Sequence, residues 1–430
     1  MKKYLFVIIF ALIADQLFAQ YDVNQIYIRI QKGESKGVVD ELSPLLKDTT
    51  FRDTEVLMVL GDAWKSQFDH NKALQSYRRV LQLDSSNKRA MESASDMYSL
   101  LGEVGSAKKL LVKLSKSDTS NIRTLNKLAQ TLQSMQEIKE AANIYNRLLK
   151  VGGVNYNTVK SLADCYWLLG DSERAEFNYK IADVLNGKSL ATKLSLSQIA
   201  FINKDLSSAK IFASRGVDLD STYMPLRKQI AIVHYKLEEY KPALANFSYL
   251  ISKGDSSSNV FKFAGACNFF MGEFDRAIPL LNEVLLKDSV DTEAMFYLAS
   301  SLSHIGKSQE AADIFNEILL LLQPDPALLY KLYNQLGIAY SALDKLHESY
   351  DYFNQAYKLN SEDSKLLFQM AMVKGGFKEK GSLTEAKSLL EQYLKAIKPK
   401  GDNLTAEETI LRERAKMYIE RLKEEIFMSE

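Results

Sequence analysis

The stretch AGACNFFMGEFDRAIPLLNEVL, residues 264–285, alternates small and bulky side chains around one short turn at Gly272. Its alanine at position 277 belongs to a series of eight alanines, each 34 residues after the one before. The series consists of Ala73, Ala107, Ala141, Ala175, Ala209, Ala243, Ala277 and Ala311. A fixed internal period predicts one continuous repeat array rather than several unrelated domains.

Residues 258–291 represent one repeat, and we number its positions from 1 to 34. Positions 4, 7, 8 and 11 form one stripe at the spacing of an amphipathic helix. Gly272, at position 15, ends this helix, and Ala277, Leu281 and Val284 form the stripe of a second helix. The repeat is therefore predicted to be a helical hairpin. Gly265 and Ala277 are small because the two helix backbones approach closely there.

The other repeats carry residues of similar size at the same positions. Position 8 reads Gly61, Ser95, Ala129, Ala163, Ser197, Ala231, Gly265, Ala299, Gly337 and Ala371. Position 24 reads Tyr77, Leu111, Tyr145, Tyr179, Ala213, Phe247, Leu281, Phe315, Phe353 and Leu390. This pattern resembles the tetratricopeptide repeat family, although that family's Trp at position 4 and its terminal Pro are absent here. The resemblance covers residues 54–397 and implies an all-α, right-handed superhelical solenoid of about ten helix-turn-helix units.

The two ends of the array are expected to differ from its middle, because a stack needs polar outer caps. Residues 20–53 resemble a degenerate first unit, and residues 398–430 are predicted to form a C-terminal capping helix. Thr405 and Glu408 have the spacing of a capping box at its start. Two insertions, around residues 324–329 and 375–381, are expected to lie in turns.

The fifth repeat, residues 190–223, has a thinner packing surface than its neighbours. It places Lys193 at a core position and Ala213 where most repeats have a large residue. We therefore predict the softest junction of the array here. The alternative is that Leu194, Phe201 or Phe212 fills the space. Equal hydrogen-exchange protection across residues 180–230 would exclude the soft junction.

Residues 1–19 have the layout of a secretory signal peptide, with Lys2 and Lys3 before a short apolar run and a predicted cut before Gln20. We therefore expect an exported protein of the periplasm of a Gram-negative bacterium, or alternatively one that is peripheral to the outer membrane or secreted.

The cut removes two of 55 basic and one of 54 acidic residues, which leaves 53 of each. Zero net charge argues against a nucleic-acid or polybasic membrane footprint. No second apolar stretch is long enough to span a membrane.

No constellation of residues indicates catalysis. The four histidines lie singly, no metal site or cofactor is predicted, and the chain is expected not to be an enzyme. The two cysteines, Cys165 and Cys267, are three periods apart, which places them too far apart for a disulfide in a stacked array. We predict two free, buried thiols.

The remaining candidate site is the face of the first helices that neighbouring repeats leave open. Position 12 carries four consecutive aromatic residues, and positions 5 and 9 carry lysines and polar residues. In the tetratricopeptide repeat family this face lines a concave groove that binds peptides or partner helices. The resemblance therefore implies a peptide-binding groove here, with the candidate residues Lys160, Asp164, Trp167, Gln198, Phe201, Lys228, Tyr235, Lys262 and Phe269. The alternative is that the aromatic residues pack against the first helix of the next repeat.

The predicted function is a non-enzymatic scaffold of the cell envelope that binds extended peptide or helical segments of other proteins. It would act as a monomer or small oligomer, without nucleic acid. The second hypothesis is a self-assembling structural component of an envelope or secretion complex.

Overall fold

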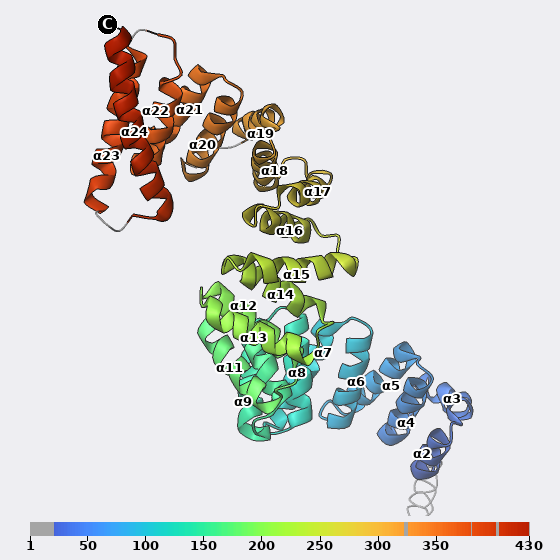
Figure 1. The fold of residues 1–430 in the computed structure, drawn as a ribbon. Coiled ribbons are helices and arrows are strands. Elements are labelled where there is room, and N and C mark those ends of the chain that lie inside the picture. The colour runs from blue at the N-terminus through green and yellow to red at the C-terminus, as the bar shows by residue number, and fades with distance from the viewer. Residues whose placement is uncertain (1–20, 322–325, 380, 401–403, 430) are drawn as a thin grey trace, which may run out of the picture. The chain divides into compact units, whose positions relative to one another are not determined.

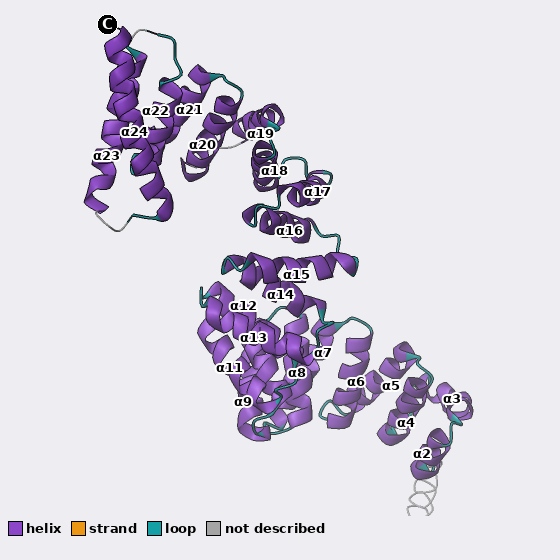
Figure 2. Ribbon diagram, in the orientation of Figure 1, coloured by secondary structure: helices purple, strands orange, loops and turns teal. Residues whose placement is uncertain are grey.

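The computed structural model describes residues 21–321, 326–379, 381–400 and 404–429. Within these ranges the chain consists of α-helices, short 3₁₀ turns and loops, with no strand (Figure 2). The predicted all-α class is confirmed. The predicted signal peptide lies outside the described residues.

The chain divides into two compact parts, residues 1–199 and 200–430. The N-terminal part contains α2 (Val23–Gln31), α3 (Ser35–Leu42), η1 (Ser43–Leu46), α4 (Thr54–Ser66), α5 (His70–Leu83), α6 (Lys88–Leu100), α7 (Val104–Ser117), α8 (Ile122–Ser134), α9 (Ile138–Gly152), α10 (Tyr156–Leu168) and α11 (Ser172–Leu185). The division falls within α12 (Leu190–Ile202).

The C-terminal part continues with helical pairs (Figure 1). It contains α13 (Leu206–Leu219), α14 (Met224–Lys236), α15 (Tyr240–Ser252), α16 (Ser258–Phe270), α17 (Phe274–Leu285), α18 (Thr292–His304), α19 (Ser308–Leu321), α20 (Pro326–Ala342), α21 (Leu346–Leu359), α22 (Lys365–Lys374), α23 (Ser382–Ile397), η2 (Lys398–Lys400) and α24 (Ala406–Ser429). In each part, consecutive helices pack on one another in chain order.

The close helix contact predicted at small residues is present. All eight alanines of the 34-residue series are fully buried. A methyl group on Gly265 would lie 2.8 Å from Leu281 Cγ, and one on Gly337 would lie 2.5 Å from Phe353 Cδ1. Position 8 of the first helix therefore faces position 24 of the second, and its small size leaves room for the large residue opposite.

The hairpin turns of the first nine repeats place position 15 in the left-handed backbone region. The residues there are Phe68, Gly102, Gln136, Gly170, Lys204, Glu238, Gly272, Gly306 and Asp344, with φ between 57° and 84°. This conformation ends a helix readily when the residue is glycine, because glycine has no Cβ to crowd the backbone. In five of these nine turns the residue is not glycine, so the backbone there is strained.

Replacing Glu238, where φ is 60°, with glycine is expected to stabilise the protein by about 0.5–1 kcal/mol. The gain is the relief of left-handed strain minus the larger entropy that glycine loses on folding. Urea unfolding followed by circular dichroism measures it. Glu317→Gly, at an exposed position inside α19, is the control and is expected to cost about 1 kcal/mol. A loss of stability in Glu238→Gly would contradict the strain argument.

Side-chain caps begin the first helices of many repeats. The last position of the preceding repeat accepts a hydrogen bond from the first turn of the helix, for example from Ala90 to Asn87 at 2.9 Å and from Thr124 to Asn121 at 3.0 Å. Such caps satisfy backbone N–H groups that the helix leaves unpaired. They mark the repeat boundary in place of the absent proline.

The two ends of the described chain have core and capping contacts of their own. Ile26, Val38 and Leu42 form the core of the N-terminal cap. At the C-terminal cap, the capping box is confirmed, because Thr405 N donates to Glu408 Oε2 at 2.9 Å and Glu408 N donates to Thr405 Oγ1 at 3.2 Å. Both cysteines are free and buried, as predicted.

One insertion does not lie wholly in a turn. Residues 326–329 form the first turn of α20, which is extended to 17 residues, whereas residues 322–325 lie outside the described ranges. Pro326 suits the start of a helix because the N–H that it lacks would have no partner there. The other insertion does lie between α22 and α23, as predicted, apart from residue 380, which is not described.

The soft junction predicted in the fifth repeat stays a prediction. Two observations bear on it: the two compact parts divide between Ile199 and Ala200, and the buried cluster of Ala200, Ala209 and Val233 is small. Phe201 packs against this cluster, as one alternative proposed. We expect faster amide hydrogen exchange in α12 and α13 than in α10 and α14, measured by mass spectrometry.

Candidate functional site

The nine residues predicted to line a groove are divided between the two parts of the chain. Lys160, Asp164, Trp167 and Gln198 belong to the N-terminal part, and the other five belong to the C-terminal part. Gln198 is exposed, and Trp167 is half-buried. The environments of the remaining residues differ from the prediction.

The aromatic side chains of the C-terminal part pack between repeats. Tyr235 is only 9% exposed, and its ring centroid lies 5.0 Å from that of Phe263 on the next first helix, α16. Its hydroxyl lies 3.3 Å from the hydroxyl of Tyr297 on α18. The expectation that Tyr235 is an exposed anchor is therefore wrong, because its ring fills the space between first helices.

Phe269 and Phe201 also pack within the array. The Phe269 ring lies 5.4 Å from that of Tyr297 in the following repeat, and Phe201 packs against the buried cluster of Ala200, Ala209 and Val233. Both side chains are half-buried. For these residues the structure agrees with the alternative interpretation, in which a stripe at repeat spacing serves packing.

The three lysines of the predicted groove already have carboxylate partners. Lys160 Nζ lies 2.8 Å from Asp164 Oδ2, and Lys228 Nζ lies 3.9 Å from Asp255 Oδ2. Lys262 Nζ lies 3.0 Å from Asp291 Oδ2, and it also pairs with Glu293. Burial alone would lower the pKa of Lys262, but hydrogen bonds from its ammonium group to these two carboxylates raise it. An anionic ligand would have to compete with these pairs.

Asp164 has a structural partner as well. The Tyr179 hydroxyl donates to Asp164 Oδ1 at 2.6 Å, so position 9 of the first helix satisfies the tyrosine at position 24 of the second. The first repeat has the same arrangement, because the Tyr77 hydroxyl donates to Asp62 Oδ1 at 2.7 Å. The prediction missed this link because it considered position 9 only as groove surface.

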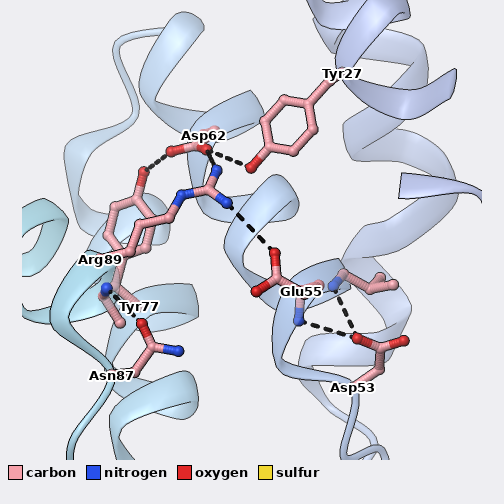
Figure 3. A network of polar contacts seen from close by, with 9 residues as sticks. Tyr27, Asp53, Glu55, Asp62, Tyr77, Asn87 and Arg89 are labelled. Carbon is pink, nitrogen blue, oxygen red and sulfur yellow. Dashed lines mark hydrogen bonds and ion pairs between the residues drawn. The ribbon is translucent and has the colours of Figure 1, made fainter. Parts of the chain in front are cut away.

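The carboxylate of Asp62 is the centre of a larger polar network (Figure 3). Its Oδ2 accepts from the Tyr27 hydroxyl at 3.0 Å and from Arg89 Nη2 at 2.9 Å, and Arg89 also pairs with Glu55. Burial raises the pKa of Asp62 above its usual value. The network joins the cap helix α2 and the second repeat to α4, which is a structural role.

Open cavities lie instead on the earlier repeats of the N-terminal part. A cavity of about 570 Å³ extends over α4, α6, α7 and α8. Its lining comprises Lys65, Ser95, Asp96, Met97, Ser99, Leu100, Val104, Leu111, Lys127, Gln130, Thr131 and Ser134. Most of the lining residues come from first helices, the face that the sequence analysis identified as open.

A second cavity of about 390 Å³ adjoins the first, and Gln130 lines both. Its lining comprises Ile122, Asn126, Gln130, Leu148, Gly152, Asn155, Asn157 and Thr158. Asn155 caps α10 by accepting from Thr158 N at 3.0 Å. Asn126, Gln130 and Asn157 have no hydrogen-bond partner among the described residues, and we call these three the open amides.

The open amides were not among the predicted groove residues, because that prediction rested on the aromatic residues at position 12. Asn126, Gln130 and Asn157 stand at positions 5, 9 and 2 of the third and fourth repeats. Amide side chains on the open face of adjacent first helices were a visible signal. Their lack of partners, however, depends on packing that the sequence does not show.

No group of three or more His, Cys, Asp or Glu side chains within the described ranges could hold a metal ion. Burial raises the pKa of the Cys165 thiol to about 11 and that of Cys267 to about 12, so neither is a ready nucleophile. In the part of the chain that the structure covers, no helix is long and apolar enough to cross a membrane.

Stacked helical hairpins with one small-residue contact per 34 residues define a helical-repeat protein. Models of the tetratricopeptide repeat match residues 269–327 and 330–363. These two segments are therefore similar to the tetratricopeptide repeat family, as the sequence pattern of the whole array is. Proteins of this family mediate protein–protein interactions.

A curated relative is the TPR repeat-containing protein YpiA of Bacillus subtilis (strain 168). It is 29% identical over 193 residues, which are 45% of this chain and 42% of that protein. The match thus spans less than half of the relative's length.

Two solved structures are also similar. The Cut9–Hcn1 hetero-tetramer of the APC/C has a TM-score of 0.44 at 15% identity, and the match covers 91% of this chain and 82% of that chain. A tetratricopeptide repeat protein from Parabacteroides merdae ATCC 43184 has a TM-score of 0.41 at 15% identity, and the match covers 66% and 98%.

Proposed function

We propose that this chain is an exported, non-enzymatic scaffold that holds an extended segment of a partner protein against the first helices of residues 54–189. The observation that carries the proposal is the set of three open amides beside two adjoining cavities. An ordinary surface amide stands alone and forms hydrogen bonds with water. Here Asn126, Gln130 and Asn157 line one connected hollow on two neighbouring first helices.

The chemistry of these side chains suits an extended main chain. Each amide offers a carbonyl acceptor and an NH₂ donor, which complement the N–H and C=O groups of a peptide without selecting its sequence. Apolar lining residues such as Ile122, Leu148 and Val104 would receive the side chains of the partner. A preformed surface also lowers the entropy cost of ordering the bound segment.

The proposal moves the centre of the groove from the aromatic row to the third and fourth repeats. Gln198 stands at position 9 of the fifth repeat, as Gln130 does in the third, and it is exposed. Gln198 and Trp167 therefore stay candidates for contact with a partner. Tyr235 does not, because its ring is buried.

The test is a triple variant, Asn126→Ala, Gln130→Ala and Asn157→Ala. Peptides selected from a displayed random library against the mature protein are measured by titration calorimetry. We expect the variant to lose at least tenfold in affinity, because each lost hydrogen bond contributes about 0.5–1.5 kcal/mol. The matched control is Asn71→Ala, Gln75→Ala and Asn143→Ala, which removes exposed amides from second helices. Equal affinity in both variants would overturn the proposal.

The envelope location forms part of the proposal and has its own test. Expression of the full chain with a C-terminal tag in a Gram-negative host, followed by fractionation and N-terminal sequencing, is expected to give a periplasmic product beginning at Gln20. A cytoplasmic product that retains Met1 would exclude export. It would leave the peptide-binding test unaffected.

Self-assembly is the second candidate, and one observation favours it. On the last helix, α24, Met417 is 72% exposed and Phe427 is 82% exposed. Apolar side chains of this size on an end cap could join two copies. Sedimentation velocity distinguishes the candidates, because assembly predicts a sedimentation coefficient that rises with concentration and falls back in Met417→Gln with Phe427→Gln. A concentration-independent monomer would exclude it.

A further inference from the structure

The second helices of the first three repeats carry a band of positive charge. Positions 18, 22, 25 and 29 of a second helix lie on one helical face, at i, i+4, i+7 and i+11. In α5, α7 and α9 these positions are Asn71, Gln75, Arg78 and Gln82, then Gly105, Lys109, Val112 and Lys116, then Lys139, Asn143, Asn146 and Lys150. They contain five basic residues and no acidic one. We call Arg78, Lys109, Lys116, Lys139 and Lys150 the basic band.

All five side chains of the basic band are exposed, and none has an ion pair or hydrogen-bond partner among the described residues. Other basic residues of the same helices do have partners. Arg79, Lys113 and Arg147 donate to the main-chain carbonyls of Thr49, Ser85 and Thr119 in preceding loops. The basic band therefore consists of the basic side chains of these helices that form no contact with another described residue through an ion pair or a hydrogen bond.

Nearby carboxylates are few or engaged elsewhere. The only acidic residue within the three helices is Glu140, at position 19. Four acidic residues at the helix ends bind neighbouring groups: Asp69 accepts from Lys72 N, Asp84 from Ser86 N, Asp118 from Ser120 N, and Glu137 pairs with Lys108. Glu103, at the start of α7, is exposed and does not cap its helix. These contacts lower the pKa of Asp84 and Asp118 and keep both carboxylates ionised at their turns.

Side chains of α7 and α9 reach back toward the preceding second helix. Lys113 Nζ of α7 lies 2.5 Å from Ser85 O, just beyond the end of α5, and Arg147 Nη2 of α9 lies 3.0 Å from Ser115 O of α7. Long basic side chains of one second helix therefore reach the preceding second helix or the loop after it. None of the five residues lines either of the cavities described above.

The band ends sharply along the chain. The corresponding positions of α11 are Glu173, Phe177, Lys180 and Val184, and later second helices mix both signs at these positions, with Asp218, Lys241, Asp275, Asp313, Asp351 and Lys358. The inference that zero net charge argues against a membrane footprint was therefore too coarse. The charges balance over the whole chain but are segregated within it.

We propose that the basic band binds the anionic headgroup surface of a phospholipid membrane. Its charges spread in two dimensions over three helices, which suits a charged plane better than a single strand. Val112, half-buried, is the one apolar residue among the twelve positions, and no aromatic residue occurs there. The hot spots of specific protein interfaces are enriched in aromatic residues, and single-stranded nucleic acid is bound with the help of stacking rings, so the absence of aromatic residues favours a membrane.

The composition of the band points the same way. Four of its five members are lysines, which act as hydrated point charges rather than planar, bidentate donors. The free energies with which such side chains bind an anionic leaflet are roughly additive. Binding through this face would hold the protein at the membrane and leave the open amides free for a partner.

The test measures binding of the full mature chain to vesicles by sedimentation. Phosphatidylcholine vesicles with and without phosphatidylglycerol are compared at low and high salt. The wild type is expected to bind only vesicles that contain phosphatidylglycerol, and more weakly as salt rises. Changing all five band residues to Gln is expected to reduce the partition coefficient roughly 10³-fold, since each basic side chain contributes roughly fivefold.

The matched control changes five exposed lysines outside the band, Lys188, Lys241, Lys331, Lys358 and Lys395, to Gln. It removes the same net charge and is expected to bind within about threefold of the wild type, because distant charges are screened. Circular dichroism confirms that both variants fold. Equal losses in the two variants, or wild-type binding to polyglutamate or duplex DNA without binding to vesicles, would overturn the proposal.

Discussion

Replacing Lys193 with alanine is expected to destabilise the N-terminal part of the chain by about 3 kcal/mol. The Lys193 side chain is only 6% exposed, and its Nζ lies 2.7 Å from Asp183 Oδ1 on α11. Alanine would leave the Asp183 carboxylate, which is 18% exposed, without its countercharge. A poorly solvated charge that loses its partner costs several kcal/mol. Urea unfolding followed by circular dichroism measures the loss.

A double variant separates the ion pair from packing. Lys193→Met combined with Asp183→Leu removes both charges and keeps the volume, so its stability is expected within about 1 kcal/mol of the wild type, or above it. The matched control is Lys180→Ala, which breaks the exposed pair between Lys180 and Glu176 on α11, the helix that carries Asp183. It should cost about 0.5 kcal/mol or less. If the double variant is as unstable as Lys193→Ala, the buried pair is not the cause.

Lys193 also shows what the sequence could and could not predict. Its departure from the apolar pattern at position 4 is visible in the sequence and suggested a thin core. Its partner is Asp183, which lies 10 residues earlier in the chain. Only the structure shows this pairing. The other basic residue at position 4, Arg227, is accommodated differently, because its guanidinium lies 4.0 Å from the ring centroid of Tyr249 and binds Asn246.

The fold was predictable because it repeats. Every repeat provides an independent observation of which positions are small, so the contact between positions 8 and 24 could be inferred and is found at Gly265 and Leu281. The positions of turns followed from the same period, although the backbone strain at Phe68 and Glu238 did not, since no glycine marks it.

The candidate site was less predictable, because a site is where the repeats differ. Position 12 showed an aromatic row, but whether a ring packs or is exposed depends on the next repeat, as the contact of Tyr235 with Phe263 shows. Lysines selected for an anionic ligand proved to pair with carboxylates whose distance in sequence varies, from four residues at Lys160 to 29 at Lys262. The 34-residue period alone does not predict which carboxylate pairs with which lysine.

Replacing Ala243 with leucine is expected to destabilise the C-terminal part by about 2–3 kcal/mol. Ala243 stands at position 20 of the sixth repeat, is fully buried, and belongs to the same core cluster as Ala231 and Phe247. Leucine adds three carbon atoms at a point where two helices approach closely, so the side chain must adopt a poor rotamer or separate α14 from α15.

The control lies in the same helix, two residues away. Ala245→Leu places the same side chain at an exposed position of α15, where it is expected to change stability by less than about 0.5 kcal/mol. Because the two variants share composition and helix propensity, their difference measures the close contact alone. Thermal and urea unfolding of both variants determine it. If Ala243→Leu were as stable as Ala245→Leu, the alanine period would reflect something other than the packing of helices. The physical basis of the repeat, and with it the placement of the open amides on first helices and of the basic band on second helices, would then need another explanation.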